Sequence, residues 1–245
     1  MRPAGALSFA VRLWVSRNSL QLAGLVPFST VDFPGRLCAV LFTQGCPLRC
    51  RYCHNPHLRP RTAQGVQSWS VMKSWLGKRV GLLDAVVFSG GEPTAQAQLP
   101  EALAGAREMG FATGLHTSGV LPQRLERVLP LLDWIGLDIK APFTRYAAIT
   151  GNSSSGPRAR RALEAVLASG INYELRTTVH TALLDDHDLM DIARTLEAYG
   201  VRRWVLQKFR HQGCDDAYLT TSNKSPRLET LLPALQLRVP DITVR

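Results

Sequence analysis

The 245-residue chain carries 29 Lys and Arg against 19 Asp and Glu, for a formal net charge of +10 at pH 7, and 45% of its residues are hydrophobic. This length and apolar content fit one large α/β domain with an ordinary core. They exclude a membrane-spanning protein of the helical kind, because no apolar run reaches the ~20 residues that cross a bilayer.

Residues 1–20 are expected to form an N-terminal arm, and residues 21–245 the folded domain. The arm has a faint likeness to a secretory signal, with Arg2, Arg12 and Arg17 among apolar residues. Arg12 interrupts the apolar run and no convincing cleavage site follows. We therefore interpret this stretch as a flexible arm or the product of an upstream start codon.

The positive charge could attract nucleic acid or an acidic protein. The basic residues are mostly scattered arginines, and the short clusters at 158–161 and 202–203 lack the interleaved aromatic side chains that stack on bases. We expect no specific nucleic-acid partner, no membrane partner and a cytoplasmic location.

From residue 37 onward, strand-like apolar runs alternate with helical patterns in six units. This alternation predicts a parallel sheet, and six units predict an incomplete barrel. The expected fold class is α/β, a partial, open, TIM-like (β/α)6 barrel of parallel strands. Strands are expected at 37–42, 85–88, 111–116, 134–139, 173–179 and 203–209, and helices at 70–80, 99–109, 122–132, 157–169, 186–199 and 228–237.

Polar motifs follow or occupy five of the expected strands. In parallel barrels the functional groups gather at the carboxyl ends of the strands, so we expect these motifs to share one rim. In chain order they are the cysteine loop, Ser89-Gly90-Gly91-Glu92-Pro93, His116-Thr117-Ser118-Gly119, Asp138-Ile139-Lys140 and Arg176.

The cysteine loop holds Cys46, Cys50 and Cys53 in the spacing C-x3-C-x2-C, with no fourth cysteine nearby. Thiolates hold iron–sulfur clusters, normally four to a cubane. Three of them on one tight loop can hold three irons and leave the fourth open, as a catalytic metal keeps a position open for substrate. The spacing therefore favours redox chemistry. Cys38 and Cys214 belong to no motif and are not expected to be ligands.

Two other uses of these cysteines are weighed. With His57 they form a Cys3His set, which could be the zinc site of a nucleic-acid-interacting module in so basic a chain. A disulfide framework is disfavoured, because five cysteines is an odd number, three of them crowd one loop, and no secretory signal precedes them.

The cysteine loop, with the aromatic Tyr52 before Cys53, resembles the signature of the radical S-adenosylmethionine enzymes. The runs 28–35 and 42–46 and the tail His54-Asn55-Pro56 narrow the resemblance to the activating proteins of anaerobic ribonucleoside-triphosphate reductase, relatives of the pyruvate formate-lyase activases. The likeness covers about 22–213, and its motifs are specific only in combination.

The resemblance implies that residues 21–245 form a radical S-adenosylmethionine domain with a [4Fe-4S] cluster on Cys46, Cys50 and Cys53. The open iron would chelate S-adenosylmethionine, and the reduced cluster would cleave it to a 5′-deoxyadenosyl radical. The resemblance further implies that the cofactor contacts Tyr52, Cys53, His54, Gly90, Gly91, Glu92, Thr117, Asp138, Lys140 and Arg176.

Two of these assignments leave a question open. Asp138 could hold a monovalent cation with Thr117, but His116 stands where the pyruvate formate-lyase activases have an aspartate, and an imidazole does not replace a carboxylate as a cation ligand. Arg176 could grip a carboxylate or ribose edge of the cofactor, or it could form a salt bridge with Glu174.

The implied function is the installation of a glycyl radical on a partner enzyme, expected to be anaerobic ribonucleotide reductase. A low-potential donor such as flavodoxin or ferredoxin would supply the electrons. An open barrel leaves a lateral gap that suits the glycine loop of a protein substrate. The alternatives are another glycyl radical enzyme as partner, or a small-molecule substrate, as in the deazapurine-forming enzymes of the same superfamily.

Overall fold

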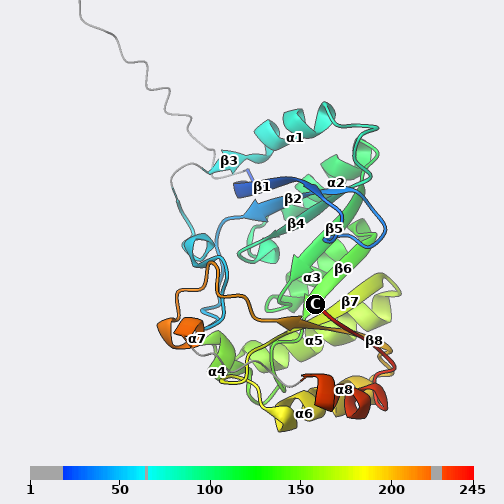
Figure 1. The fold of residues 1–245 in the computed structure, drawn as a ribbon. Helices are drawn as coiled ribbons and strands as arrows, with labels where there is room; N and C mark the ends of the chain where they lie inside the picture. Colours follow the sequence, from blue (N-terminus) through cyan, green and yellow to red (C-terminus); the bar gives the residue numbers. More distant parts are fainter. Residues whose placement is uncertain (1–18, 64–65, 222–227) are drawn as a thin grey trace, which may run out of the picture.

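The computed structural model describes residues 19–63, 66–221 and 228–245. Within this part of the chain one sheet runs in the order β3-β1-β2-β4-β5-β6-β7-β8-β9, and it ends at β3 and β9 without closing (Figure 1). All neighbours from β2 to β9 are parallel, so the expected open barrel of parallel strands is confirmed. The strands are β1 (Gln21–Ser29), β2 (Cys38–Thr43), β3 (Gln67–Ser68), β4 (Ala85–Gly90), β5 (Ala112–Thr117), β6 (Trp134–Asp138), β7 (Asn172–Val179), β8 (Arg203–Lys208) and β9 (Asp241–Val244).

Three strands were not expected from the sequence. β1 pairs with β2, and β3 with β1, in antiparallel fashion, so one edge of the sheet departs from the expected parallel order. The sequence pattern did not predict β1, because two irregularities in its pairing with β2 break the alternation of buried and exposed residues. β3 and β9 have two and four residues, too few to show a period.

Each of the expected helices is present with slightly different ends, and the helices pack along the sheet (Figure 1). Local signals explain their ends: Asp185 and Asp188 form a capping box at the start of α6, and Gly170 ends α5 in the left-handed conformation. No described helix is long and apolar enough to cross a membrane. The helices are α1 (Trp69–Gly77), α2 (Leu99–Glu108), α3 (Pro122–Val128), α4 (Tyr146–Thr150), α5 (Ser155–Ser169), α6 (Asp186–Ala198), α7 (Ala217–Thr221) and α8 (Leu228–Gln236), with 3-10 turns η1 (Pro56–Leu58), η2 (Pro93–Ala95) and η3 (Leu129–Leu131).

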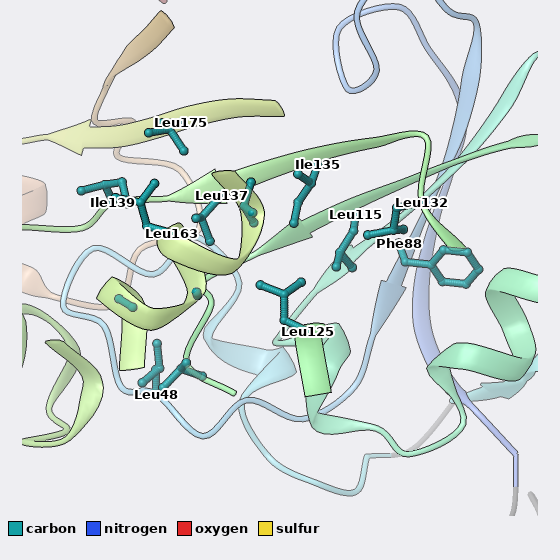
Figure 2. Packing of buried hydrophobic residues seen from close by; sticks show 14 of the residues in the cluster. Leu48, Phe88, Leu115, Leu125, Leu132, Ile135, Leu137, Ile139, Leu163 and Leu175 are labelled. Atoms are coloured by element: carbon teal, nitrogen blue, oxygen red, sulfur yellow. The ribbon is translucent and has the colours of Figure 1, made fainter. Parts of the chain in front are cut away.

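The main core lies between the sheet and the helices. Figure 2 shows Leu115, Ile135 and Leu137 of neighbouring strands beside Leu125 of α3 and Leu163 of α5, all fully buried. Because successive strand residues point to opposite faces, a second cluster forms on the other face. It comprises Phe33, Cys38, Val40, Ala85, Val87 and Trp134.

Most of the expected N-terminal arm, residues 1–18, lies outside the described residues. Leu20 is described and is fully buried in the main core. The backbone N–H of Trp69 at the start of α1 donates to the carbonyl of Leu20 at 3.1 Å. The folded part of the chain therefore already includes Leu20.

Candidate active site

The cysteine loop connects β2 to η1 and is held from both sides by backbone hydrogen bonds. On one side, the N–H of Gly45 donates to Leu58 O at 2.8 Å. On the other, the N–H of Arg49 donates to Thr150 O at 2.8 Å and that of Arg51 to Ile149 O at 3.1 Å, at the end of α4. The loop is thus a fixed part of the fold, and its three cysteines are free thiols.

A cavity of about 130 Å³ lies beside this loop, at the carboxyl ends of four parallel strands. It brings together motifs that are up to 94 positions apart in the chain, from Cys46 to Lys140. The carboxyl-end rule for parallel barrels accounts for this convergence. The cavity is lined by Cys46, Leu48, Cys50, Ser89, Gly90, Gly91, His116, Thr117, Ser118, Asp138 and Lys140.

Gly90 and Gly91 bring β4 against the cysteine loop. A Cβ on Gly90 would lie 2.3 Å from the Thr43 nitrogen, and Gly90 has a φ of +116°, which disfavours any side chain. A Cβ on Gly91 would lie 2.4 Å from Gly45 O. The N–H of Glu92 donates to that same Gly45 carbonyl at 2.9 Å. The two glycines are therefore required for backbone contact between the two motifs.

Glu92 is almost fully buried, with 1% of its surface exposed, and its carboxylate is occupied within the protein. Oε1 accepts from Thr117 Oγ1 at 2.6 Å and from the N–H and hydroxyl of Thr94 at 3.2 and 2.6 Å. Oε2 accepts from the N–H and hydroxyl of Ser118 at 2.9 and 2.5 Å. The side chain thus ties the end of β4 to the end of β5.

Lys140 is a buried cation at the same rim. Its Nζ donates to Asp138 Oδ2 at 2.7 Å and lies 5.5 Å from the centre of the Tyr52 ring. Burial alone would lower the pKa of Lys140, but the carboxylate of Asp138, followed by Tyr52 and Cys50, raises it well above its usual value. The lysine therefore stays charged next to the cysteine loop.

Burial raises the pKa of the Cys46 thiol to about 12, and the nearby Glu92 adds to this effect. Burial also raises the pKa of Cys50, which Lys140 partly opposes. Buried thiols without a metal are therefore protonated, and binding iron requires the loss of these protons. A positive charge at Lys140 favours the thiolate forms that a cluster needs.

The possible cation ligands are already engaged. Asp138 pairs with Lys140, and Thr117 donates to Glu92. His116 donates from Nε2 to Asp32 O at 2.9 Å, and burial together with Arg176 lowers its pKa to about 4, so the imidazole is neutral. The carboxylate that lines this cavity, that of Asp138, is thus ion-paired through Oδ2 with Lys140.

Arg176 does not line the cavity. Its Nε donates to Glu174 Oε1 at 2.7 Å, both side chains are buried, and the guanidinium lies 5.1 Å from the centre of the Trp134 ring. Of the two roles that the sequence allowed for Arg176, the structure therefore shows the salt bridge with Glu174. Arg176 stands opposite Asp138 in the pairing of β6 with β7, next to the rim.

His54 and Tyr52 lie on the two sides of Cys53. His54 donates from Nε2 to Arg210 O at 2.9 Å and stacks on Phe209, with ring centres 5.4 Å apart. Burial lowers the pKa of His54. The imidazole therefore links the cysteine loop to the segment that follows β8.

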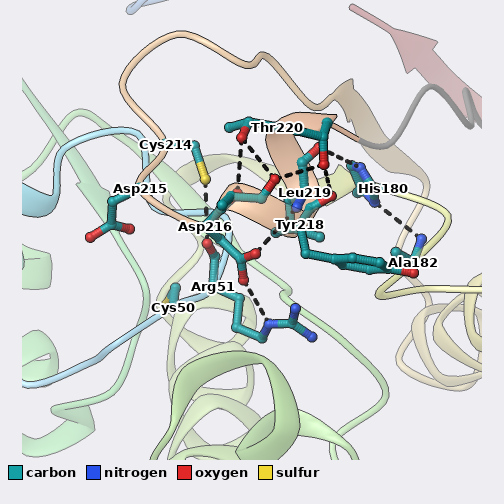
Figure 3. Close-up of polar contacts among 12 residues, drawn as sticks. Cys50, Arg51, His180, Ala182, Cys214, Asp215, Asp216, Tyr218, Leu219 and Thr220 are labelled. Atoms are coloured by element: carbon teal, nitrogen blue, oxygen red, sulfur yellow. Dashed lines mark hydrogen bonds and ion pairs between the residues drawn. The ribbon is translucent and has the colours of Figure 1, made fainter.

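Residues 213–216 also contact the cysteine loop, and sequence reasoning missed this contact. Figure 3 shows Cys214 and Asp216 beside Arg51. Cys214 Sγ lies 3.4 Å from Arg51 O, and Arg51 Nε donates to Asp216 Oδ2 at 2.9 Å. A Cβ on Gly213 would lie 2.3 Å from His54 O. Contacts across 165 positions leave no local signal in the sequence.

The donor set fits a cluster better than a single zinc ion. Within the described residues, no group of three or more His, Cys, Asp or Glu is arranged to hold one metal ion, so Cys46, Cys50, Cys53 and His57 do not converge as a tetrahedral zinc site requires. A cubane binds each thiolate on a different iron, so its ligands surround a larger group and need not all reach one common ion. The thiols, the adjoining cavity and the buried lysine are compatible with a cluster.

The family profile described as "Radical SAM superfamily" matches residues 40–198. The chain is 28% identical over 214 residues to a protein of Methanocaldococcus jannaschii named as a glycyl-radical enzyme activating enzyme, with 84% of this chain and 85% of that protein covered. It is 32% identical over 180 residues to the pyruvate formate-lyase-activating enzyme of Clostridium pasteurianum, with 70% and 71% covered.

Other relatives are longer than this chain. The PqqA peptide cyclase of Gluconobacter oxydans is 38% identical over 146 residues, which are 56% of this chain and 40% of that protein. The crystal structure of Streptococcus suis SuiB bound to S-adenosylmethionine has a TM-score of 0.65 at 13% identity, over 82% of this chain and 48% of SuiB. The chain thus spans about half the length of SuiB, and the likeness shows the fold.

Proposed function

Because this chain belongs to the radical SAM superfamily, we propose that it is an activating enzyme that installs a glycyl radical on a partner enzyme. The observation that carries the proposal is the cavity that Cys46 and Cys50 share with Gly90, Gly91 and the Asp138–Lys140 pair. The coverage of 85% and 71% of two relatives named as activating enzymes also supports it.

Membership of the superfamily implies a [4Fe-4S] cluster and S-adenosylmethionine, and together these supply one-electron chemistry that removes a hydrogen atom from the substrate. In our proposal Cys46, Cys50 and Cys53 are the ligands of the cluster. Lys140 offsets the negative charge of the thiolates in the low-dielectric interior. The protein otherwise binds and orients the reactants and excludes competing reactions.

The remaining roles in the proposal follow from the contacts. Gly90 and Gly91 offer their backbone to S-adenosylmethionine, and the Asp138–Lys140 pair presents both charges to its amino acid part. Glu92 holds the Gly90–Gly91 segment in position, because its carboxylate accepts a hydrogen bond from Thr117 at the end of β5. Tyr52, His54 and Arg176 would line or support the cofactor site from the adjoining segments.

The charge pair gives a first test. Asp138→Ala and Lys140→Ala should each weaken binding of S-adenosylmethionine about tenfold or more, because a hydrogen bond to a charged group contributes roughly 1.5–3 kcal/mol. Iron content after reconstitution should stay close to that of the wild type, since neither residue is a ligand and Lys140 only assists the loss of the thiol protons. Calorimetric titration of the loaded protein measures the affinity. Lys78→Ala at the exposed end of α1 is the control. Unchanged affinity in both variants would mean that the pair is structural.

The partner in the proposal is a glycyl radical enzyme, and anaerobic ribonucleotide reductase is the specific candidate. The open edges of the sheet suit a protein substrate that must insert a loop. Flavodoxin or ferredoxin would donate the electrons. The resemblance of 28–35 and 42–56 to reductase activases supports this choice of partner.

The decisive experiment combines the anaerobically loaded protein, S-adenosylmethionine, a low-potential reductant and the candidate reductase. We expect 5′-deoxyadenosine and the electron paramagnetic resonance doublet of a glycyl radical on the reductase. A reductase whose radical-bearing glycine is changed to alanine is the control and should give no doublet. Cofactor cleavage with a doublet on a different glycyl radical enzyme would identify another partner. Cleavage with turnover of a purine precursor and no doublet would favour the small-molecule alternative.

A further inference from the structure

Arg59 contacts the cysteine loop through both its backbone and its side chain. Its carbonyl oxygen accepts from the N–H of Cys46 at 3.1 Å. Its Nη2 donates to Cys50 O at 3.4 Å. Arg59 directly follows η1 as its C-cap residue. It therefore links segments that a cluster must hold in one geometry.

One donor of this guanidinium has no acceptor. Arg59 Nε is buried without a hydrogen-bond partner, one of two such side-chain atoms among the described residues. A buried donor without a partner costs roughly 1–3 kcal/mol. The sulfur of an adjacent cysteine can accept a hydrogen bond, and it accepts better as a thiolate, when it is a ligand. The unpaired Nε–H is thus a free buried donor beside the cysteine loop.

A second loop holds the arginine from the opposite side. Asp215 Oδ1 accepts from Arg59 Nη2 at 3.0 Å, although the two residues are 156 positions apart. Burial alone would lower the pKa of Arg59, but the Cys53 thiol and the Asp215 carboxylate raise it. Arg59 therefore remains cationic, with 25% of its side chain exposed. The neighbouring pair of Arg51 with Asp216 keeps this loop in place (Figure 3).

We propose that Arg59 is a positioning residue that donates a hydrogen bond to the Cys53 sulfur of the bound cluster and so raises the reduction potential of the cluster. In this proposal Asp215 holds the guanidinium of Arg59 and partly neutralises its charge. This inference rests on the proposed function only in requiring that the chain hold a cluster. It needs no particular substrate or partner.

The sign of the effect follows from electrostatics. Reduction adds one negative charge to the cluster, and hydrogen bonds to its sulfurs and nearby charge set its potential. A cation next to Cys53 favours the reduced state. Removal of Arg59 should therefore lower the potential, while removal of the Asp215 charge should raise it. A role confined to folding would not produce opposite shifts from the two partners.

The experiment is an anaerobic redox titration of the reconstituted protein, with the reduced cluster followed by electron paramagnetic resonance. For Arg59→Gln we expect the ratio of reduced to oxidised cluster at a fixed potential to fall about tenfold, a shift of about 59 mV for one electron. Asp215→Asn should move the ratio the other way. Arg59→Lys keeps the charge and should recover most of the shift. Arg203→Gln, which breaks an exposed pair with Asp241, is the matched control and should change nothing.

The measured reduction potentials separate the possible outcomes. Potentials that stay unchanged in Arg59→Gln and Asp215→Asn, or that shift in the same direction, would overturn the inference. If Arg59→Gln loads no cluster, Asp215→Asn carries the test, because it leaves the Arg59 side chain and its contact with Cys50 O in place. A wild-type chain that holds no cluster would overturn the proposed function together with this inference. If the wild type loads its cluster and the variants keep its reduction potential, this inference alone is overturned.

Discussion

Replacing Cys46, Cys50 or Cys53 with alanine is expected to abolish the iron–sulfur cluster, while the wild type is expected to carry about four irons per chain as one cubane. In the proposed arrangement each thiolate holds a different iron, so we expect the two remaining ligands not to retain the cluster. Iron and sulfide analysis after anaerobic reconstitution, with the visible absorbance of the brown protein, measures the loss.

The two other cysteines provide matched controls. Cys38 is fully buried in β2, where its Sγ donates to Ser29 O at 3.5 Å, and Cys38→Ala should leave the iron content unchanged. Cys214→Ala is the sharper control, because Cys214 Sγ lies only 3.4 Å from Arg51 O, next to the ligand loop. Loss of the cluster in Cys214→Ala would contradict the three-ligand arrangement.

The second large effect is expected at Glu92. Glu92→Ala removes the acceptor for five buried donors of Thr94, Thr117 and Ser118, which then lose their partner. We expect the free energy of unfolding to fall by roughly 4 kcal/mol, because each unsatisfied buried donor costs roughly 1–3 kcal/mol and partial relaxation recovers some of it. Urea denaturation of the protein without its cluster measures this loss apart from iron binding.

Glu108→Ala is the control for this change. Glu108 ends α2, its side chain is 71% exposed, and its pairing with Lys73 at 3.6 Å should contribute at most about 1 kcal/mol. Glu92→Gln keeps the shape of the side chain and one acceptor oxygen. Its loss of unfolding free energy should therefore lie between those of Glu92→Ala and Glu108→Ala. A loss below about 1 kcal/mol in Glu92→Ala would show that the carboxylate does not join β4 to β5.

The six parallel strands and their helices could be predicted because their signals are local. An apolar run such as 85–88, or a glycine such as Gly170 at a helix end, carries its structural meaning within a few residues. The gathering of Cys46, Gly91 and Lys140 at one rim also followed from the sequence, since parallel strands place their carboxyl ends together.

Other features had no local signal and were decided by the tertiary structure. The antiparallel β1 depends on irregular pairing with β2, and the pair of Arg59 with Asp215 joins segments 156 positions apart. The hydrogen bonds from Thr117 and Ser118 to the Glu92 carboxylate likewise depend on where β5 ends. The sequence by itself determined the open parallel barrel and the cysteine loop, because periodicity and spacing are local properties. Only the tertiary structure decided which charges meet there, because side chains distant in the chain become neighbours only when the sheet forms.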